Sequence, residues 1–96
     1  KKMDISKWNY GDYSSDNYGA NSIAIRIGAL TLYFSYNTVV AFETIKTGLV
    51  VSENVWSKTT GKHLNWINSD KKARQSSAEF EKQLEQVLKD FGLTVS

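Results

Sequence analysis

The chain has 96 residues and a formal net charge of +2, with 41% hydrophobic and 23% charged residues. This composition is typical of one small globular domain and excludes a disordered chain, while the net charge alone does not indicate nucleic acid. The absence of cysteine excludes disulfides, thiolate metal sites and cysteine nucleophiles. Because no apolar run approaches about 18 residues, we expect no membrane span, and we expect no export signal.

Residues 1–21 form a polar arm in which aromatic residues alternate with small ones, and we expect one short strand near residues 7–10. The aromatic residues are Trp8, Tyr10, Tyr13 and Tyr18. Such rings can stack on unpaired bases, or they can fold onto a sheet. The second interpretation is favoured, because no arginine or lysine lies between Lys7 and Arg26.

Residues 22–54 show the period-two pattern of strands with one buried face. The isoleucines at 23, 25 and 27 alternate with smaller or polar residues, and the pattern resumes from Leu30 to Tyr36. Gly28 and Ala29 lie between them and predict a type II′ hairpin turn. Further turns at 37–38 and 46–48 precede strands at 39–42 and 49–52. These short connections predict an antiparallel meander.

A C-terminal helix is predicted over residues 76–91, beginning with a capping box from Ser76 to Glu79. One apolar stripe follows, made of Phe80, Leu84, Val87, Leu88 and Phe91. Gly92 and Leu93 are typical of a left-handed C-cap. The predicted fold is therefore α+β: an antiparallel four- to five-stranded meander sheet, covered on one face by this helix, with a short helix around 58–68.

The segment from 54 to 67 holds the only histidine and two of the three tryptophans. A helix after Ser57 would place Trp56, Thr60, His63, Leu64 and Ile67 on one side; a hairpin turning at 59–62 is the alternative. Glycine within a helix costs about 1 kcal/mol relative to alanine, so Gly61 predicts the close approach of another backbone.

Three chemical functions fit this segment poorly. A phosphate loop requires Gly-x-x-x-x-Gly-Lys-Ser/Thr, but His63 occupies the last position and the first glycine is absent. His63 could act as a base only if folding brought a partner such as Glu53 or Asp70 to it. A single histidine without cysteine leaves only carboxylates to complete a metal site. We therefore expect no enzyme, no metal and no cofactor.

Binding is the function that the segment favours. Five basic residues face one acid, Asp70, between 58 and 74, a local charge of +4. The candidate contact residues are Trp56, Lys58, Thr59, Thr60, Lys62, His63, Trp66, Lys71, Lys72 and Arg74. Lysines can hold phosphates while a tryptophan stacks, so nucleic acid is the leading partner. A protein bound through a tryptophan anchor, a homo-oligomer such as a dimer, and a merely solvated face are the alternatives.

Two runs, YFSYNTVVAF at 33–42 and NVWSKTTGKHLN at 54–65, resemble a family of small uncharacterised proteins from bacteriophages and mobile elements. The resemblance extends from about Asn17 to Leu88. It implies a phage-encoded protein that acts in the cytoplasm of a bacterial host. Small accessory proteins of phages often inhibit host defences, as anti-CRISPR proteins do, or bind nucleic acid. The resemblance carries no catalytic residues over to this chain.

Overall fold

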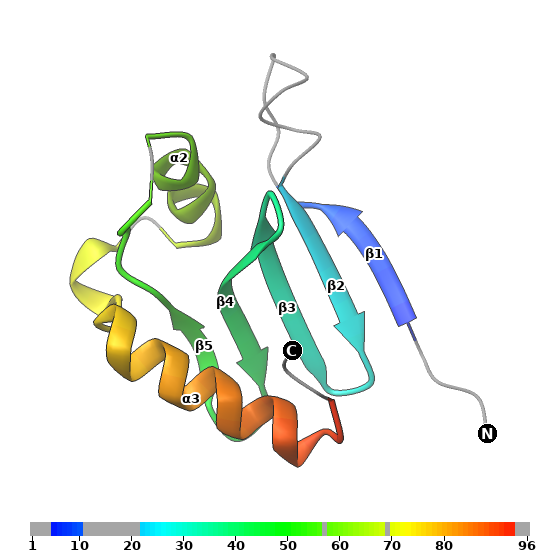
Figure 1. Ribbon diagram of the computed structural model, residues 1–96. Helices are drawn as coiled ribbons and strands as arrows, with labels where there is room; N and C mark the ends of the chain where they lie inside the picture. The colour runs from blue at the N-terminus through cyan, green and yellow to red at the C-terminus, as the bar shows by residue number, and fades with distance from the viewer. Residues whose placement is uncertain (1–4, 11–21, 57, 69, 94–96) are drawn as a thin grey trace.

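The structure is a computed structural model that describes residues 5–10, 22–56, 58–68 and 70–93. Its centre is a five-stranded antiparallel meander, in which each strand pairs with the next along the chain (Figure 1). The strands are β1 (Ile5–Asn9), β2 (Ile23–Ile27), β3 (Leu30–Ser35), β4 (Thr38–Thr44) and β5 (Gly48–Val51). The predicted α+β fold and its meander are confirmed.

The first hairpin turns at Gly28 and Ala29, as predicted. Gly28 has φ +60°, and Ala29 is not among the residues with positive φ, which is the pattern of a type II′ turn. The second turn lies at residues 36–37, one residue earlier than predicted. There Tyr36 adopts the left-handed conformation with φ +56°, which costs a bulky residue about 1–2 kcal/mol.

A β-bulge in β4 lets this strand contribute to two hydrophobic cores, one on each face of the sheet. Tyr33 pairs with Ala41, but Phe34 pairs with Val39, so Val40 is the extra residue. Val40 and Ala41 consequently face the same side of the sheet, whereas Val39 and Phe42 face the other. Side chains 39–42 therefore do not alternate strictly between the two faces. Because of the bulge, this strand buries side chains on both faces of the sheet.

The helix α3 (Ser77–Asp90) covers one face, as predicted. Phe80 and Val87 join Leu30, Leu32, Phe42 and Val50 in the first core, and Phe80 packs against Phe42 with ring centroids 5.6 Å apart. The Ser76 side chain caps the helix by accepting from Glu79 N at 3.4 Å. At the other end Gly92 has φ +72° and Leu93 N bonds the Leu88 carbonyl, which is a Schellman cap.

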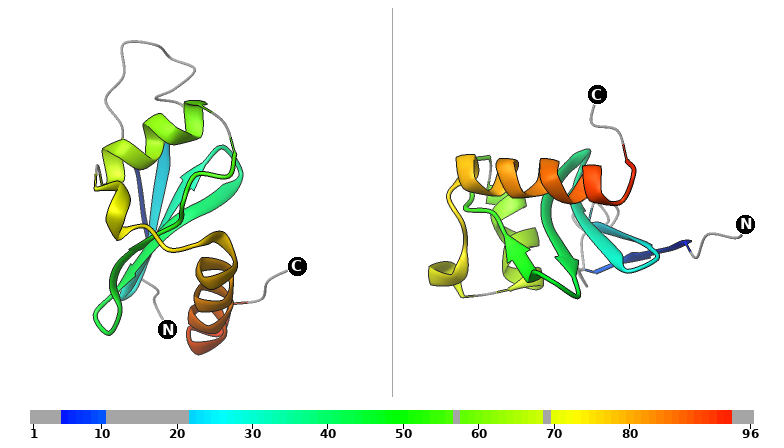
Figure 2. Two further views of the ribbon diagram at one scale, coloured as in Figure 1. Left: turned by 90° about the vertical axis from the view of Figure 1, so that its left-hand side faces the viewer. Right: turned by 90° about the horizontal axis from the view of Figure 1, so that it is seen from below.

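The helix α2 (Lys58–Ile67) covers the opposite face of the sheet (Figure 2), which the sequence had not indicated. Leu64 packs there with Val40, Ala41 and Val51 in the second core. At this end the molecule thus has three layers, with the sheet between two helices.

The segment from 53 to 75 leaves the sheet and returns to it at one point. Ser52 and Gln75 form a parallel bridge, in which Glu53 N donates to the Gln75 carbonyl at 2.7 Å and Gln75 N donates to the Val51 carbonyl at 2.8 Å. The Glu53 carboxylate also accepts from Ser77 N at the start of α3, where negative charge is favourable. These bonds join the two ends of the segment 53–75, which we call the excursion. It contains α2 and the 3-10 helix η1 (Lys71–Ala73).

Candidate functional site

The inner side of α2 is fixed to the sheet by a buried polar network. Ser35 Oγ on β3 shares hydrogen bonds with Thr60 Oγ1 at 2.9 Å and with His63 Nδ1 at 2.6 Å. All three side chains are buried, and His63 is 0% exposed. Thr60 and His63 are therefore not contact residues for a partner, contrary to the sequence-based expectation, because the helix turns them toward the sheet.

Two aromatic rings lie against the His63 imidazole. The Tyr10 ring meets it edge-on at 6.1 Å, and the Tyr36 ring lies 5.9 Å from it. Tyr10 also contacts the Tyr33 ring at 5.5 Å, and its hydroxyl donates to the Phe34 carbonyl at 2.7 Å. At Tyr10, the interpretation that these aromatics fold onto the sheet is confirmed. Tyr13 and Tyr18 lie outside the described residues.

The contact between Ser35 and His63 has the form of a nucleophile with its base. A substrate would have to reach a hydroxyl that is 2% exposed and already bonded to Thr60. The pair instead joins α2 to β3, and the hydroxyl satisfies polar atoms that would otherwise be costly to bury.

The outer side of α2 carries exposed Lys62, Asn65 and Trp66. Lys62 and Trp66 are four residues apart, a spacing that places their side chains next to each other on a helix. Trp66 is 48% exposed, and Trp56, just before the helix, is 39% exposed. The side chains of Lys58 and Thr59 lie outside the described part of the structure.

After α2 the chain folds back so that η1 lies beside the end of the helix. Arg74 Nη2 donates to Asn65 Oδ1 at 2.9 Å and to the Asn68 carbonyl at 3.4 Å. Asp70 Oδ1 accepts from Lys72 N, which fixes the turn between the helices. Arg74 is thereby brought to the end of the helix that carries Trp66.

Arg74 has a mainly structural role in this arrangement. Its side chain is half-buried, and its Nε is a buried atom without a hydrogen-bond partner. Lys72 is exposed, and the side chain of Lys71 is outside the described part. Four of the candidate residues thus have exposed side chains, one before α2, two on α2 and one on η1. We call them together the tryptophan–lysine surface: Trp56, Lys62, Trp66 and Lys72.

Gly61 permits a close contact within the excursion. A Cβ atom at this position would lie 2.9 Å from Asn54 Nδ2. The neighbour is thus a side chain, and the prediction of a close backbone is wrong in this detail. Asn54 Oδ1 in turn accepts from Trp56 N at 3.0 Å, so the small residue at 61 helps to position the segment that carries Trp56.

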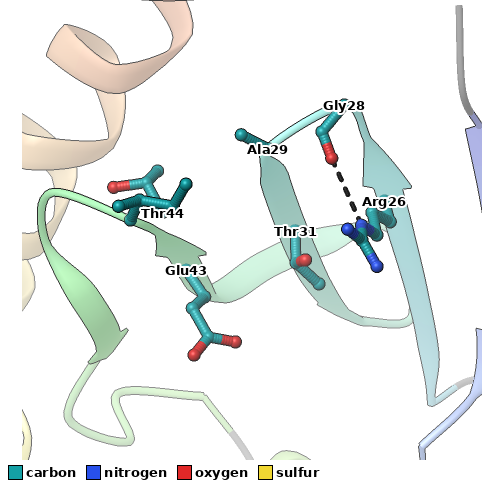
Figure 3. A pocket seen from close by; sticks show the side chains of 7 residues that line it. Arg26, Gly28, Ala29, Thr31, Glu43 and Thr44 are labelled. Atoms are coloured by element: carbon teal, nitrogen blue, oxygen red, sulfur yellow. Dashed lines mark hydrogen bonds between the residues drawn. The ribbon is translucent and has the colours of Figure 1, made fainter.

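A second feature is a shallow depression of about 480 Å³ at the other end of the same sheet face. Arg26, Thr31 and Glu43 lie in one row across three strands and line it together with the turn residues (Figure 3). Arg26 Nε donates to the Gly28 carbonyl at 3.2 Å. Burial, and secondarily the Glu43 carboxylate, raise the pKa of nearby Tyr33 above its ordinary value of 10.0.

Among the described residues, no three histidine, aspartate or glutamate side chains are grouped so that they could hold a metal ion. In the same part of the chain, no helix is long and apolar enough to cross a membrane.

The fold and the surface define a small α+β protein with a five-stranded antiparallel sheet and exposed tryptophans and lysines on α2 and on the segments that flank it. More particularly, the chain belongs to a family of unknown function (DUF8033), whose model matches residues 5–82. This match includes the whole sheet, α2, η1 and the first part of α3. No curated protein and no solved structure matches the chain significantly.

Proposed function

We propose that this protein is a non-enzymatic binding module that contacts nucleic acid through the tryptophan–lysine surface. The observation that carries the proposal is the adjacent, exposed pair of Lys62 and Trp66 on a helix whose opposite side is locked to the sheet. An ammonium group beside an indole can neutralise a phosphate while the ring stacks on the neighbouring base.

The surroundings of the pair favour an anionic partner. Lys72 is exposed on η1, and Arg74 adds a positive charge where it contacts Asn65. The residues from 58 to 74 carry a formal charge of +4, although the whole chain carries only +2. We therefore expect binding that depends on phosphates and stacking, with little preference for base sequence.

The first test compares Lys62→Ala/Lys72→Ala with the unchanged protein. The probe is a fluorescein-labelled single-stranded oligothymidylate of about 12 nucleotides, within the site size of one small domain. Polarisation titrations at about 50 and 200 mM salt give the salt dependence. Each lost phosphate contact to a single strand should reduce the slope of log K against log salt by about 0.7, so the double variant should lose about 1.4.

The matched control is Lys46→Ala/Lys82→Ala, which removes the same charge from exposed lysines in the β4–β5 turn and on α3. Its slope should equal that of the unchanged protein. Equal losses in both double variants, or no binding to single- or double-stranded DNA or RNA at either salt, would contradict the proposal.

Stacking is tested separately at Trp66. Trp66→Phe keeps an aromatic face, whereas Trp66→Leu keeps an apolar side chain without one. Because stacking on an aromatic ring contributes about 1–3 kcal/mol per base, Trp66→Leu should weaken binding about fivefold or more, and Trp66→Phe much less. Equal affinities of the two variants would leave the ring without a stacking role.

The exposed pair Val55 and Trp56 favours a second candidate, a protein partner. Val55 is 55% exposed, and both side chains lie in the segment that leads into α2. An exposed tryptophan next to an exposed aliphatic residue is typical of the anchor of a protein-binding surface, and the nearby lysines would form its rim. In this function the partner is a host protein of a bacterial cytoplasm, consistent with an inhibitor or accessory factor. Trp56→Ser would then abolish partner capture without altering the salt slope for nucleic acid.

A further inference from the structure

Among the described residues, β1 pairs with β2 alone, so its other edge has no strand partner there. β1 is one of the two edge strands of the sheet (Figure 1). All five of its residues are exposed. Tyr10 N donates to the Ser22 carbonyl, which shows that even-numbered residues of this strand direct their main-chain groups toward β2. The N–H and C=O groups of Ile5, Lys7 and Asn9 therefore point away from the sheet.

The side chains beside this edge are basic and apolar. Neither β1 (ISKWN) nor β2 (IAIRI) contains an acidic residue, whereas Lys7 and Arg26 are both exposed. The register places Lys7 and Ile5 on one face and Trp8 on the other, opposite Ala24. Beside Lys7 a groove of about 260 Å³ is lined by Ile23, Ile25, Phe34, Tyr36 and Asn37.

We propose that β1 binds an extended acidic peptide segment of a partner protein, which adds a sixth strand to the sheet. The outward main-chain groups of three residues supply the hydrogen bonds, as in other cases of strand addition. Lys7 selects carboxylates on the face of the added strand that it shares, while the exposed Trp8 accepts apolar side chains on the other face. Arg26, one strand further in, adds positive charge on the Trp8 face.

The same charge pattern disfavours a second copy of the chain as the added strand. Lys7 is the central residue of β1, so antiparallel pairing of two copies over all five residues places one Lys7 opposite the other. Like charges directly opposite in a sheet are destabilising, and edge lysines are a common protection against self-pairing. An acidic strand turns this repulsion into attraction.

The test uses capped, fluorescein-labelled peptides of eight residues that alternate valine with glutamate, or valine with lysine. A third peptide repeats the valine–glutamate sequence with alternate backbone nitrogens methylated on one edge. Polarisation should detect binding of the first peptide alone. Lys7→Glu should weaken that binding about fivefold or more and improve binding of the lysine peptide, because an attractive cross-strand pair becomes repulsive.

Amide hydrogen exchange followed by NMR supplies the second measurement. On addition of the valine–glutamate peptide, the amides of Ile5, Lys7 and Asn9 should gain protection. Those of Ser6 and Trp8, which already face β2, should change little. The expected pattern thus alternates along one strand, which a nonspecific effect of peptide charge would not produce.

Three results would overturn the proposal. Equal binding of the glutamate and lysine peptides removes the charge selection, and equal binding of the methylated peptide removes the strand addition. Concentration-dependent dimerisation of the free protein that Lys7→Pro abolishes would identify a second copy as the occupant. None of these results affects the tryptophan–lysine surface, whose residues lie between 56 and 72 and not on β1.

Discussion

A buried polar contact decides how the candidate site is oriented. Ser35 meets both Thr60 and His63, which are three residues apart and so lie on one side of α2. The helix can satisfy these polar atoms in only one rotation about its axis, and that rotation directs Lys62 and Trp66 outward. The residues that look most reactive in the sequence are thus the ones that position the exposed residues.

Replacing Ser35 should therefore destabilise the protein beyond the loss of one hydroxyl. Ser35→Ala removes one hydrogen-bond partner from each of two buried side chains, and such losses cost about 1–3 kcal/mol. Urea unfolding followed by tryptophan fluorescence measures the change. Ser6→Ala, at an exposed position of β1, is the matched control and should stay within about 0.5 kcal/mol. Equal effects of the two changes would argue against the network.

Ser35 itself was not identified from the sequence. It lies in a strand whose leucines and phenylalanine all point to the α3 face, and the predicted fold had a helix on that face only. The alternation of side chains could have located it, because a period of two places Tyr33 and Ser35 on the second face of the sheet together with Ala24. Small and polar side chains there leave room for a second helix.

At the level of elements, α2 shows why a short helix with a glycine can be stable. Gly61 lowers its intrinsic propensity, but Leu64 is buried against three residues of the sheet, and tertiary packing outweighs propensity. The close approach of Asn54 to Gly61 also links the helix to the segment before it.

This contact predicts a coupling between positions 54 and 61. Alanine at 61 should favour the helix by about 1 kcal/mol, but its Cβ would displace Asn54, which accepts from Trp56 N. We expect Gly61→Ala alone to give little net stabilisation. The same change in an Asn54→Ala background should recover most of the helix gain.

The coupling is measured as a double-mutant cycle of urea unfolding free energies. The single variant should in addition alter the fluorescence of Trp56, because its segment moves. Additive free energies in the cycle would mean that the Asn54 side chain adapts without cost, and the contact would then have no energetic role.

For the whole molecule, two helices on opposite faces make one sheet the shared support of both cores. Tyr33 belongs to the second core, and burial followed by the Glu43 carboxylate raises its pKa. The folded state therefore holds the phenol proton more tightly than the unfolded state. Its contribution to stability is complete below the ordinary pKa of 10.0 and is lost as the pH rises through the folded pKa.

Alkaline stability should accordingly depend on Tyr33. The free energy of urea unfolding should fall above about pH 10 in the unchanged protein, and Tyr33→Phe should flatten this fall. Glu43→Gln should reduce the fall only in part, because burial is the larger cause. Tyr36→Phe serves as a matched control that leaves Tyr33 in place, and a flattening there equal to that of Tyr33→Phe would count against the assignment.

The sequence by itself determined the α+β class, the meander, the turn at Gly28 and both ends of α3, because these features follow from local rules of periodicity, turn conformation and capping. It also favoured a short helix around 58–68 and grouped Thr60 and His63 with Leu64 on one side of it, but it did not indicate that this side faces the sheet. Only the tertiary structure decided that α2 lies on the face opposite α3, since a bulge at Val40 changes which face each β4 residue joins. Which reactive-looking residues are buried depends on contacts between strands and helices far apart in the chain. For that reason Thr60 and His63 are buried against the sheet, and Lys62 and Trp66 are exposed on the outer side of α2.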